Sequence, residues 1–87
     1  MSRLGGDIPA MERLHGQLVQ KSQEIQRLRS ELTNLVNGTY WEGPAAQRFR
    51  TDWSGQYSPN LTKLDQALNE LGRAVQSRKD ALIQVSA

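Results

Sequence analysis

The sequence predicts an all-α fold, an antiparallel two-helix hairpin that pairs with a second hairpin to form a four-helix bundle. Apolar residues recur at spacings of three and four through both halves of the chain, a pattern typical of packed helices. No segment alternates apolar and polar residues as a half-buried strand does. A single short break, residues 38–43, separates the two halves, so the helices must fold back on each other.

Composition limits the chain to one domain, residues 1–87, and excludes several kinds of site. With no Cys, the chain has no disulfide and no thiolate metal ligand. His15 is the single histidine, so one chain cannot provide a His pair for zinc, and we expect no metal, cofactor or small-molecule substrate. The net charge of +2 is spread along the sequence, which argues against a nucleic-acid partner.

The first helix is expected from about residue 7 to residue 37. Asp7 is a plausible N-cap, and Pro9 fits the first turn. The apolar seam has one gap, where we expect the aliphatic stem of Lys21 to cover the seam while its ammonium reaches water. Asn37 and Gly38 should end the helix, because both tolerate a left-handed cap. The seam residues are Met11, Leu14, Leu18, Ile25, Leu28, Leu32 and Leu35.

The second helix is expected from about residue 44 to residue 86, with Gly43 as cap and Pro44 at the first helical position. Pro59 removes one helical hydrogen bond and crowds the preceding turn, so a kink or short break is expected between Gly55 and Pro59. Up to Leu61, apolar residues on one face step by four: Phe49, Trp53, Tyr57 and Leu61. From Leu61 on, the seam alternates by three and four: Leu61, Leu64, Leu68, Leu71, Val75, Arg78, Leu82 and Val85.

The apolar face is wider than a two-helix seam needs. Ala67, Ala74 and Ala81 each precede a seam residue of the second helix at intervals of seven, and Ile8 and Val36 flank the seam of the first. Such a face suits a four-helix bundle, in which each helix touches two neighbours. The residues expected at a partner interface are Leu14, Leu18, Ile25, Leu28, Leu32, Phe49, Trp53, Leu64, Leu68, Leu71 and Val75.

The break holds a Trp-x-Gly triplet, Trp41-Glu42-Gly43, between the two long heptad helices. A triplet arises often by chance, but its place at mid-chain is specific. Trp41 can close the end of the hairpin as an apolar plug, present a contact to another protein, or do both. Gly43 is expected to serve a tight backbone geometry.

On these features the chain resembles the WXG family, the hundred-residue Trp-x-Gly proteins of type VII (ESX) secretion. The resemblance covers nearly the whole length: the opening Asp7-Ile8-Pro9, the central triplet, the following Phe49 and Trp53, and a second helix rich in Leu, Ala and Asn. It implies a hairpin that dimerises antiparallel with itself or with a related WXG chain. It also implies that Trp41 and Gly43 form half of a composite export signal read by the secretion ATPase.

The resemblance implies a secreted effector-type protein that is assembled in the cytoplasm and exported without a Sec signal. Consistent with that route, residues 1–9 contain no apolar core of the Sec type. One departure stands out: the family's second half-signal, Tyr-x-x-x-Asp/Glu, is missing, because Pro44 and Leu61 follow Tyr40 and Tyr57 four residues on. Either a partner chain supplies that signal or the sequence is trimmed.

Two other functions fit the residues less well. The chain could be a chaperone or targeting partner of a larger type VII toxin, which the missing half-signal would also suit. It could instead be a generic coiled-coil adaptor whose triplet is accidental. Catalysis is not expected, because a two-helix hairpin offers no enclosed pocket.

Overall fold

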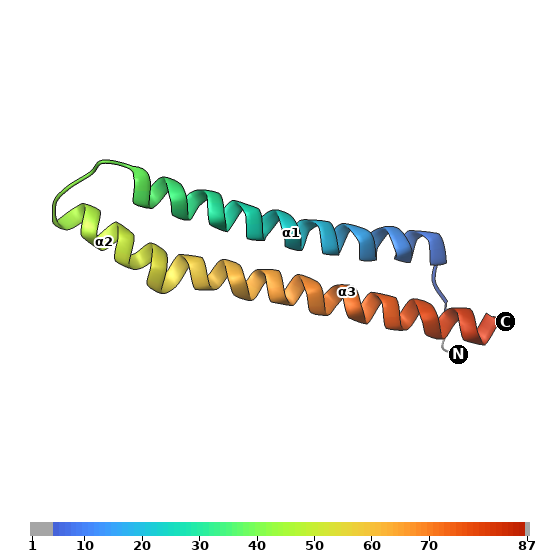
Figure 1. Cartoon of the computed structure of the whole chain (residues 1–87). Helices are drawn as coiled ribbons and strands as arrows, with labels where there is room; N and C mark the ends of the chain where they lie inside the picture. The colour runs from blue at the N-terminus through green and yellow to red at the C-terminus, as the bar shows by residue number, and fades with distance from the viewer. Residues whose placement is uncertain (1–4, 87) are drawn as a thin grey trace.

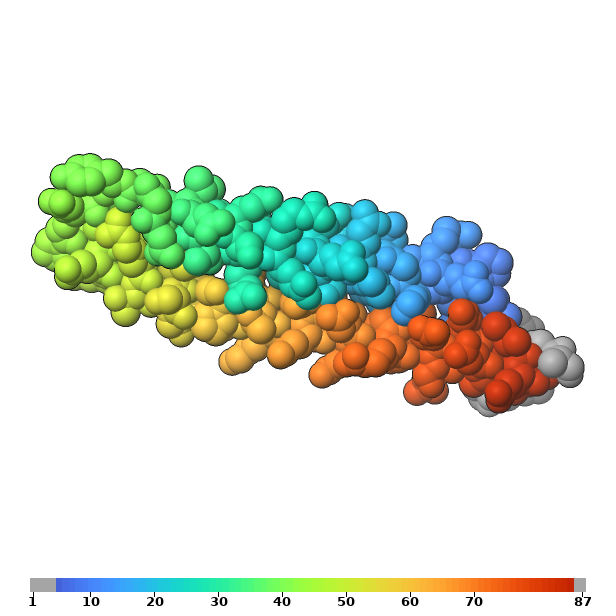
Figure 2. Space-filling model, viewed as in Figure 1, coloured from blue at the N-terminus to red at the C-terminus, as the bar shows by residue number. Residues whose placement is uncertain are grey.

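The computed structural model describes residues 5–86, which form a helical hairpin (Figure 1). Helix α1 spans Ile8–Gly38, and the returning arm consists of α2 (Pro44–Asp52), the π-helical segment η1 (Trp53–Tyr57) and α3 (Ser58–Ser86). The described residues contain no strand. The two arms lie side by side along a rod of 64 × 22 × 14 Å, with the turn at one end and the described ends of the chain at the other (Figures 1 and 2). The predicted all-α hairpin is therefore confirmed.

The ends of α1 are capped by side chains on both sides. The Asp7 carboxylate accepts a hydrogen bond from the Ala10 N–H at 3.1 Å, as its predicted N-cap role requires. At the other end, the predicted left-handed cap at Asn37 or Gly38 is wrong, because α1 continues through Gly38. Thr39 ends the helix in an extended conformation, and both its N–H and its hydroxyl donate to the Leu35 carbonyl.

The expected irregularity before Pro59 takes the form of one wide helical turn, so the returning arm stays continuous (Figure 1). The Ser58 N–H donates to the Trp53 carbonyl, five residues back, which is the hydrogen bond that defines a π-helix. A π turn takes in more residues than an α turn. That accounts for the steps of four from Phe49 to Leu61, followed by the heptad spacing of α3.

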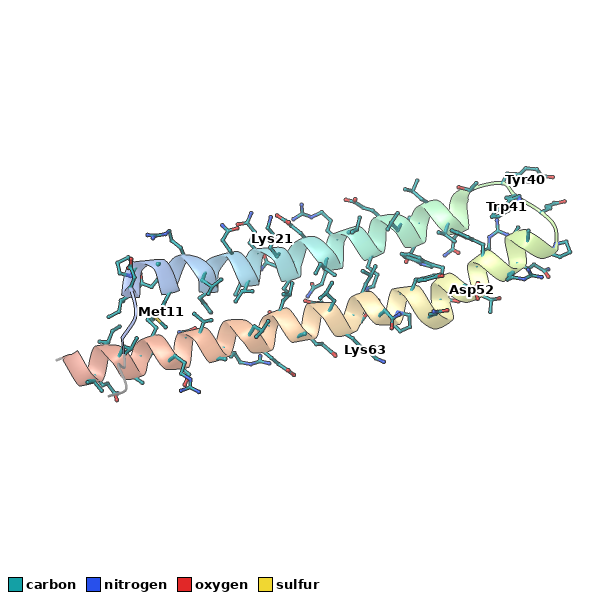
Figure 3. The ribbon with its side chains drawn as sticks, turned by 180° about the vertical axis from the view of Figure 1, so that it is seen from behind. Met11, Lys21, Tyr40, Trp41, Asp52 and Lys63 are labelled. Atoms are coloured by element: carbon teal, nitrogen blue, oxygen red, sulfur yellow. The ribbon has the colours of Figure 1, made fainter. Side chains whose placement is uncertain are left out.

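A polar network joins the two arms midway along the hairpin. The buried Ser22 hydroxyl donates to the Asp65 carboxylate, which also accepts from Gln26 at 2.9 Å and from Asn69 at 3.2 Å. The gap in the α1 seam is thus filled differently from the prediction. Ser22 occupies the buried position, while Lys21 points away from α3 and reaches Glu24 at 3.2 Å (Figure 3). A serine fits there because the opposing helix supplies a carboxylate.

The contact between the arms buries very few residues completely. Among residues 5–85, Ser22, Ala46 and Gly72 are the fully buried ones, and the leucines of both seams stay at least partly exposed. The chain exposes 6814 Å². A folded monomer of its 9.8 kDa mass exposes about 5,200 Å². The surplus of roughly 1,600 Å² on this one chain is about twice the area that each partner contributes to a standard protein–protein interface, about 800 Å².

We predict that the Asp65 network makes the fold acid-sensitive. Hydrogen bonds from Ser22 and Gln26, followed by the nearby Arg29 charge and the Asn69 amide, lower the pKa of Asp65 below its ordinary value of 3.8. A carboxyl with a depressed folded pKa stabilises the fold while ionised. Its contribution is therefore full above pH 3.8 and is lost as the pH falls through the folded pKa.

Thermal melts between about pH 6 and pH 2 should show this loss in the natural chain and a smaller one in Asp65→Asn. Asp52→Asn, which lies outside the network, is the matched control and should keep the natural profile. Equal acid sensitivity in the natural chain and in Asp65→Asn would contradict the assignment.

We also predict that Gly72→Ala stabilises the hairpin. A methyl group at Gly72 would meet His15, Leu18 and Val19 at 3.6 to 3.9 Å, which are ordinary contact distances. The replacement also removes the conformational penalty of glycine in a helix, about 0.5–1 kcal/mol. Gly16→Ala, in α1 with nothing within 4 Å of the new methyl group, should gain only the helix term. Urea unfolding should therefore rank Gly72→Ala above Gly16→Ala, and the reverse order would show that the helices approach too closely at Gly72.

Candidate functional site

The turn of the hairpin is held by hydrogen bonds from both arms. The Thr39 N–H and hydroxyl bind the last turn of α1, and the Arg50 guanidinium on α2 donates to the Thr39 carbonyl at 3.0 Å. A cation at this position also suits the negative end of the α1 dipole. Arg50 therefore ties the first helix of the returning arm to the C-terminal end of α1.

Gly43 has the one backbone conformation in the described chain with a positive φ, at φ 115° and ψ 174°. This region is essentially restricted to glycine. The residue is also the N-cap of α2, and its carbonyl accepts from the Gln47 N–H at 3.1 Å. The glycine of the triplet thus lets the chain reverse and enter the next helix within one residue.

Trp41 packs on one side and faces solvent on the other. Its ring lies 5.8 Å from the Phe49 ring, tilted by 56°, and 44% of the residue remains exposed. Leu35, Val36, Thr39 and Arg50 complete a mainly apolar hollow of about 160 Å³ around this pair. Tyr40 next to it is 86% exposed at the end of the hairpin (Figure 3). Trp41 therefore packs against Phe49 at the turn and also presents an aromatic surface to solvent.

A second anchor fixes the wide turn of the returning arm to α1. The Trp53 indole N–H donates to the Thr33 hydroxyl at 2.9 Å, and that hydroxyl in turn donates to the Arg29 carbonyl. An open groove of about 300 Å³ runs beside this contact. Trp53 is thus a half-buried member of the hairpin interface, in contrast to the exposed Tyr57.

Along the rods, each predicted seam divides into an inner and an outer row. In α1, Leu18, Ile25 and Leu32 are half-buried between the arms. Leu14, Leu28 and Leu35, each three or four residues from a residue of the inner row, remain 46 to 63% exposed. In α3, the half-buried row is Leu61, Leu68, Val75 and Leu82, and the exposed row is Leu64, Leu71, Arg78 and Val85. The alanines Ala67, Ala74 and Ala81 lie exposed beside this outer row.

The two outer rows lie on the same side of the hairpin. In each helix an outer residue directly precedes a residue that faces the other arm: Leu28 precedes Arg29, Leu64 precedes Asp65, and Leu71 precedes Gly72. One step back along an α-helix turns by about 100°. Because the two right-handed helices run in opposite directions, this equal rotation carries both rows to one side. The hairpin consequently has one broad face with two parallel rows of apolar side chains, here called the outer face.

The structure brings together the predicted site residues in two groups. Trp41, Gly43 and Phe49 lie at the turn, while the leucines of α1 and α3 line the outer face or its inner edge. Sequence reasoning missed Arg50 and Asp65. Both act on residues far along the chain, Asp65 on a serine 43 positions away, so no local pattern marks them.

Two further properties concern only the described part of the chain. No helix there combines the length and apolarity needed to cross a membrane. No group of three or more metal-ligating side chains comes together there either.

Comparison with known proteins gives one match. The family model WXG100, described as proteins of 100 residues with WXG, matches residues 7–85. No curated protein matches the chain. No solved structure matches it.

We predict that Gly43→Ala destabilises the hairpin by about 1–3 kcal/mol, because an L side chain is strained at this φ and ψ. Gly38→Ala is the matched control: Gly38 lies in the last turn of α1 with open space around it, so alanine should be tolerated. A chemically synthesised chain with D-alanine at position 43 should recover most of the loss, since D-residues favour positive φ. Thermal melts that treat L- and D-alanine alike would refute this role.

Proposed function

Because the chain belongs to the WXG100 family and is thus a small helical protein associated with type VII secretion, we propose that it is exported as a paired hairpin and acts by recognising other proteins. Its partner in the pair is a second copy or a related WXG chain. The component that recognises the pair for export is the type VII ATPase. The pair is assembled in the cytoplasm and leaves by a Sec-independent route.

The outer face is the observation that carries this proposal. The hairpin fully buries only three of its described residues. Its two apolar rows lie on one side and form a surface that a partner can cover. Exposed apolar surface of this extent is typical of a protein-binding face. A second hairpin laid on it would give each helix the two neighbours of a four-helix bundle. Of the interface residues predicted above, Leu14, Leu28, Leu64 and Leu71 belong to the outer rows and form the centre of the proposed contact, with the half-buried Leu18, Ile25, Leu32, Leu68 and Val75 along its inner edge.

The turn supports a separate recognition role. A half-exposed Trp41 backed by Phe49 offers a rigid aromatic contact at one end of the rod. Tryptophan is strongly favoured at binding hot spots, because it buries a large area with little loss of conformational freedom. Gly43 and Arg50 hold the loop that carries it. We assign Trp41 and Gly43 to the export signal on this basis.

Binding, not catalysis, is the activity we propose. One hollow, of about 490 Å³, is an open groove along the surface of α3, lined by Arg73, Gln76, Ser77, Asp80, Ala81 and Gln84. Such a groove does not exclude water from a reacting group. A flat apolar face and an exposed tryptophan suit protein partners instead.

The export role is tested with Trp41→Ala in a bacterium that has the matching secretion system. We expect export to fall at least about tenfold, as when a hot-spot tryptophan is removed, while the cell retains folded protein. Tyr40→Ala, its 86% exposed neighbour, is the matched control and should be exported normally. Light scattering of each purified variant verifies that pairing is intact. Normal export of Trp41→Ala with intact pairing would show that Trp41 is not part of the signal.

A further inference from the structure

The side of α2 that contacts α1 is out of step with the heptad pattern of α3. Carried back by intervals of seven, the row that α3 turns to α1 predicts that Gln47, Thr51 and Ser54 would also face α1. These three residues are exposed. The residues that do face α1 lie one position earlier in each case: Ala46, Arg50 and Trp53. Relative to a regular continuation of α3, α2 is therefore rotated by one residue, or about 100°.

The wide turn η1 supplies this rotation. The Ser58 N–H reaches the Trp53 carbonyl, so the turn includes one residue more than an α turn does. The returning arm stays continuous through it (Figure 1). Pro59 favours a wide turn here, because its ring has no N–H and would crowd the carbonyl four residues before it in a regular helix. One extra residue thus changes which side of α2 faces α1 without interrupting the arm.

The rotation also places the aromatic pair of the turn. Phe49 lies 5.8 Å from Trp41 and is next to Arg50 on α2. Without the extra residue, Phe49 would be carried about 100° round the helix, to the direction that the exposed Arg48 now has. Arg50 would likewise leave the Thr39 carbonyl, which it now reaches at 3.0 Å. The backing of Trp41 therefore depends on the wide turn at the other end of α2.

A hydrogen bond between the arms holds the wide turn in place. The Trp53 indole N–H donates to the Thr33 hydroxyl at 2.9 Å, and that hydroxyl is oriented by its own bond to the Arg29 carbonyl at 2.8 Å. Both Trp53 and Thr33 are half-buried. In a regular continuation of α3, Ser54 would take the place of Trp53, and its hydroxyl already donates within its own arm. The indole reaches Thr33 only in the rotated arrangement.

Building on the proposed recognition of Trp41, we propose that Thr33 and Trp53 are positioning residues for that contact. Their hydrogen bond holds the wide turn, the wide turn sets the rotation of α2, and the rotation keeps Phe49 behind Trp41. Thr33 acts through these residues and need not touch the protein that recognises the turn.

Thr33→Val tests the proposal, because valine keeps the β-branched shape and removes the hydroxyl. In a chain labelled with fluorinated tryptophan, the fluorine resonance of Trp53 should shift, and that of Trp41 should shift with it. Trp41→Phe and Trp53→Phe assign the two resonances. Thr33→Ser keeps a hydroxyl and should restore both. Thr62→Val is the matched control, since the Thr62 hydroxyl donates to the Ser58 carbonyl within its own arm at 3.3 Å, and it should leave the Trp41 resonance in place.

Export provides the functional measurement. Thr33→Val should be exported about fivefold less than the natural chain, the population change that the loss of one hydrogen bond produces. Thr33→Ser should be exported normally. Circular dichroism and light scattering verify that each variant is folded and paired.

A one-residue deletion tests the rotation itself. Deleting Gln56 together with Pro59→Ala removes both the extra residue and the obstacle to a regular helix. The arm can then continue as one α-helix with the same side of α2 facing α1, so the Trp41 resonance should stay near its position in the natural chain. A displacement as large as that caused by Thr33→Val, in a chain that circular dichroism shows to be helical, would overturn the assigned role of the wide turn.

The remaining outcomes separate this proposal from the proposed function. A Trp41 resonance that Thr33→Val leaves unchanged, while the Trp53 resonance moves, would overturn the positioning role. So would normal export of Thr33→Val with a shifted Trp41 resonance, if Trp41→Ala itself is not exported. Normal export of Trp41→Ala would instead overturn the proposed role of Trp41 in export, and the fluorine resonances would still decide whether Thr33 positions Trp41.

Discussion

The structure depends on one constraint: a helix in a two-helix hairpin has a single neighbour. Only one line of each helix can then be buried, and the rest of a broad apolar face must stay in water. In this chain the inner rows around Leu18 and Leu68 reach half burial, and the outer rows around Leu28 and Leu71 do not. Because burial of apolar area is the main stabilising contribution to folding, a partner that covered the outer rows would stabilise a hairpin of this kind further.

The narrow contact between the two helices also explains why a polar network around Asp65 is favourable at its centre. In a deep core, Asp65 and Ser22 would be an expensive choice, since an ionised carboxylate loses hydration there. At a narrow interface, the carboxylate of Asp65 stays partly hydrated and also accepts hydrogen bonds from three side chains. Such a contact forms only when the two arms are aligned, whereas leucines can slide past one another by a heptad. We interpret the network as the element that fixes the register of the hairpin.

Much of this architecture could be predicted from the sequence, because it depends on local rules. Heptad spacing, the Asp7 cap and the irregularity before Pro59 each follow from residues within one or two turns. The predictions were wrong where contacts between residues distant in the sequence determine the local structure. Ser22 is buried because Asp65 lies opposite it, and α1 ends at Thr39 because its hydroxyl and Arg50 satisfy the exposed carbonyls. The outer face depends on local and on distant information. The heptad periodicity predicts which residues form the seam, but only the packing of the two arms shows which of them are half-buried and which are exposed.

The rod shape has a consequence for passage through narrow openings. The hairpin is 64 Å long, but its two shorter dimensions are 22 and 14 Å. Viewed end-on, it is little more than two helices wide, each about 10–12 Å across with its side chains. Doubling the hairpin into a bundle thickens one short dimension and leaves the length almost unchanged. A conduit wide enough for four helices can therefore accept the pair lengthwise while every backbone hydrogen bond stays in place.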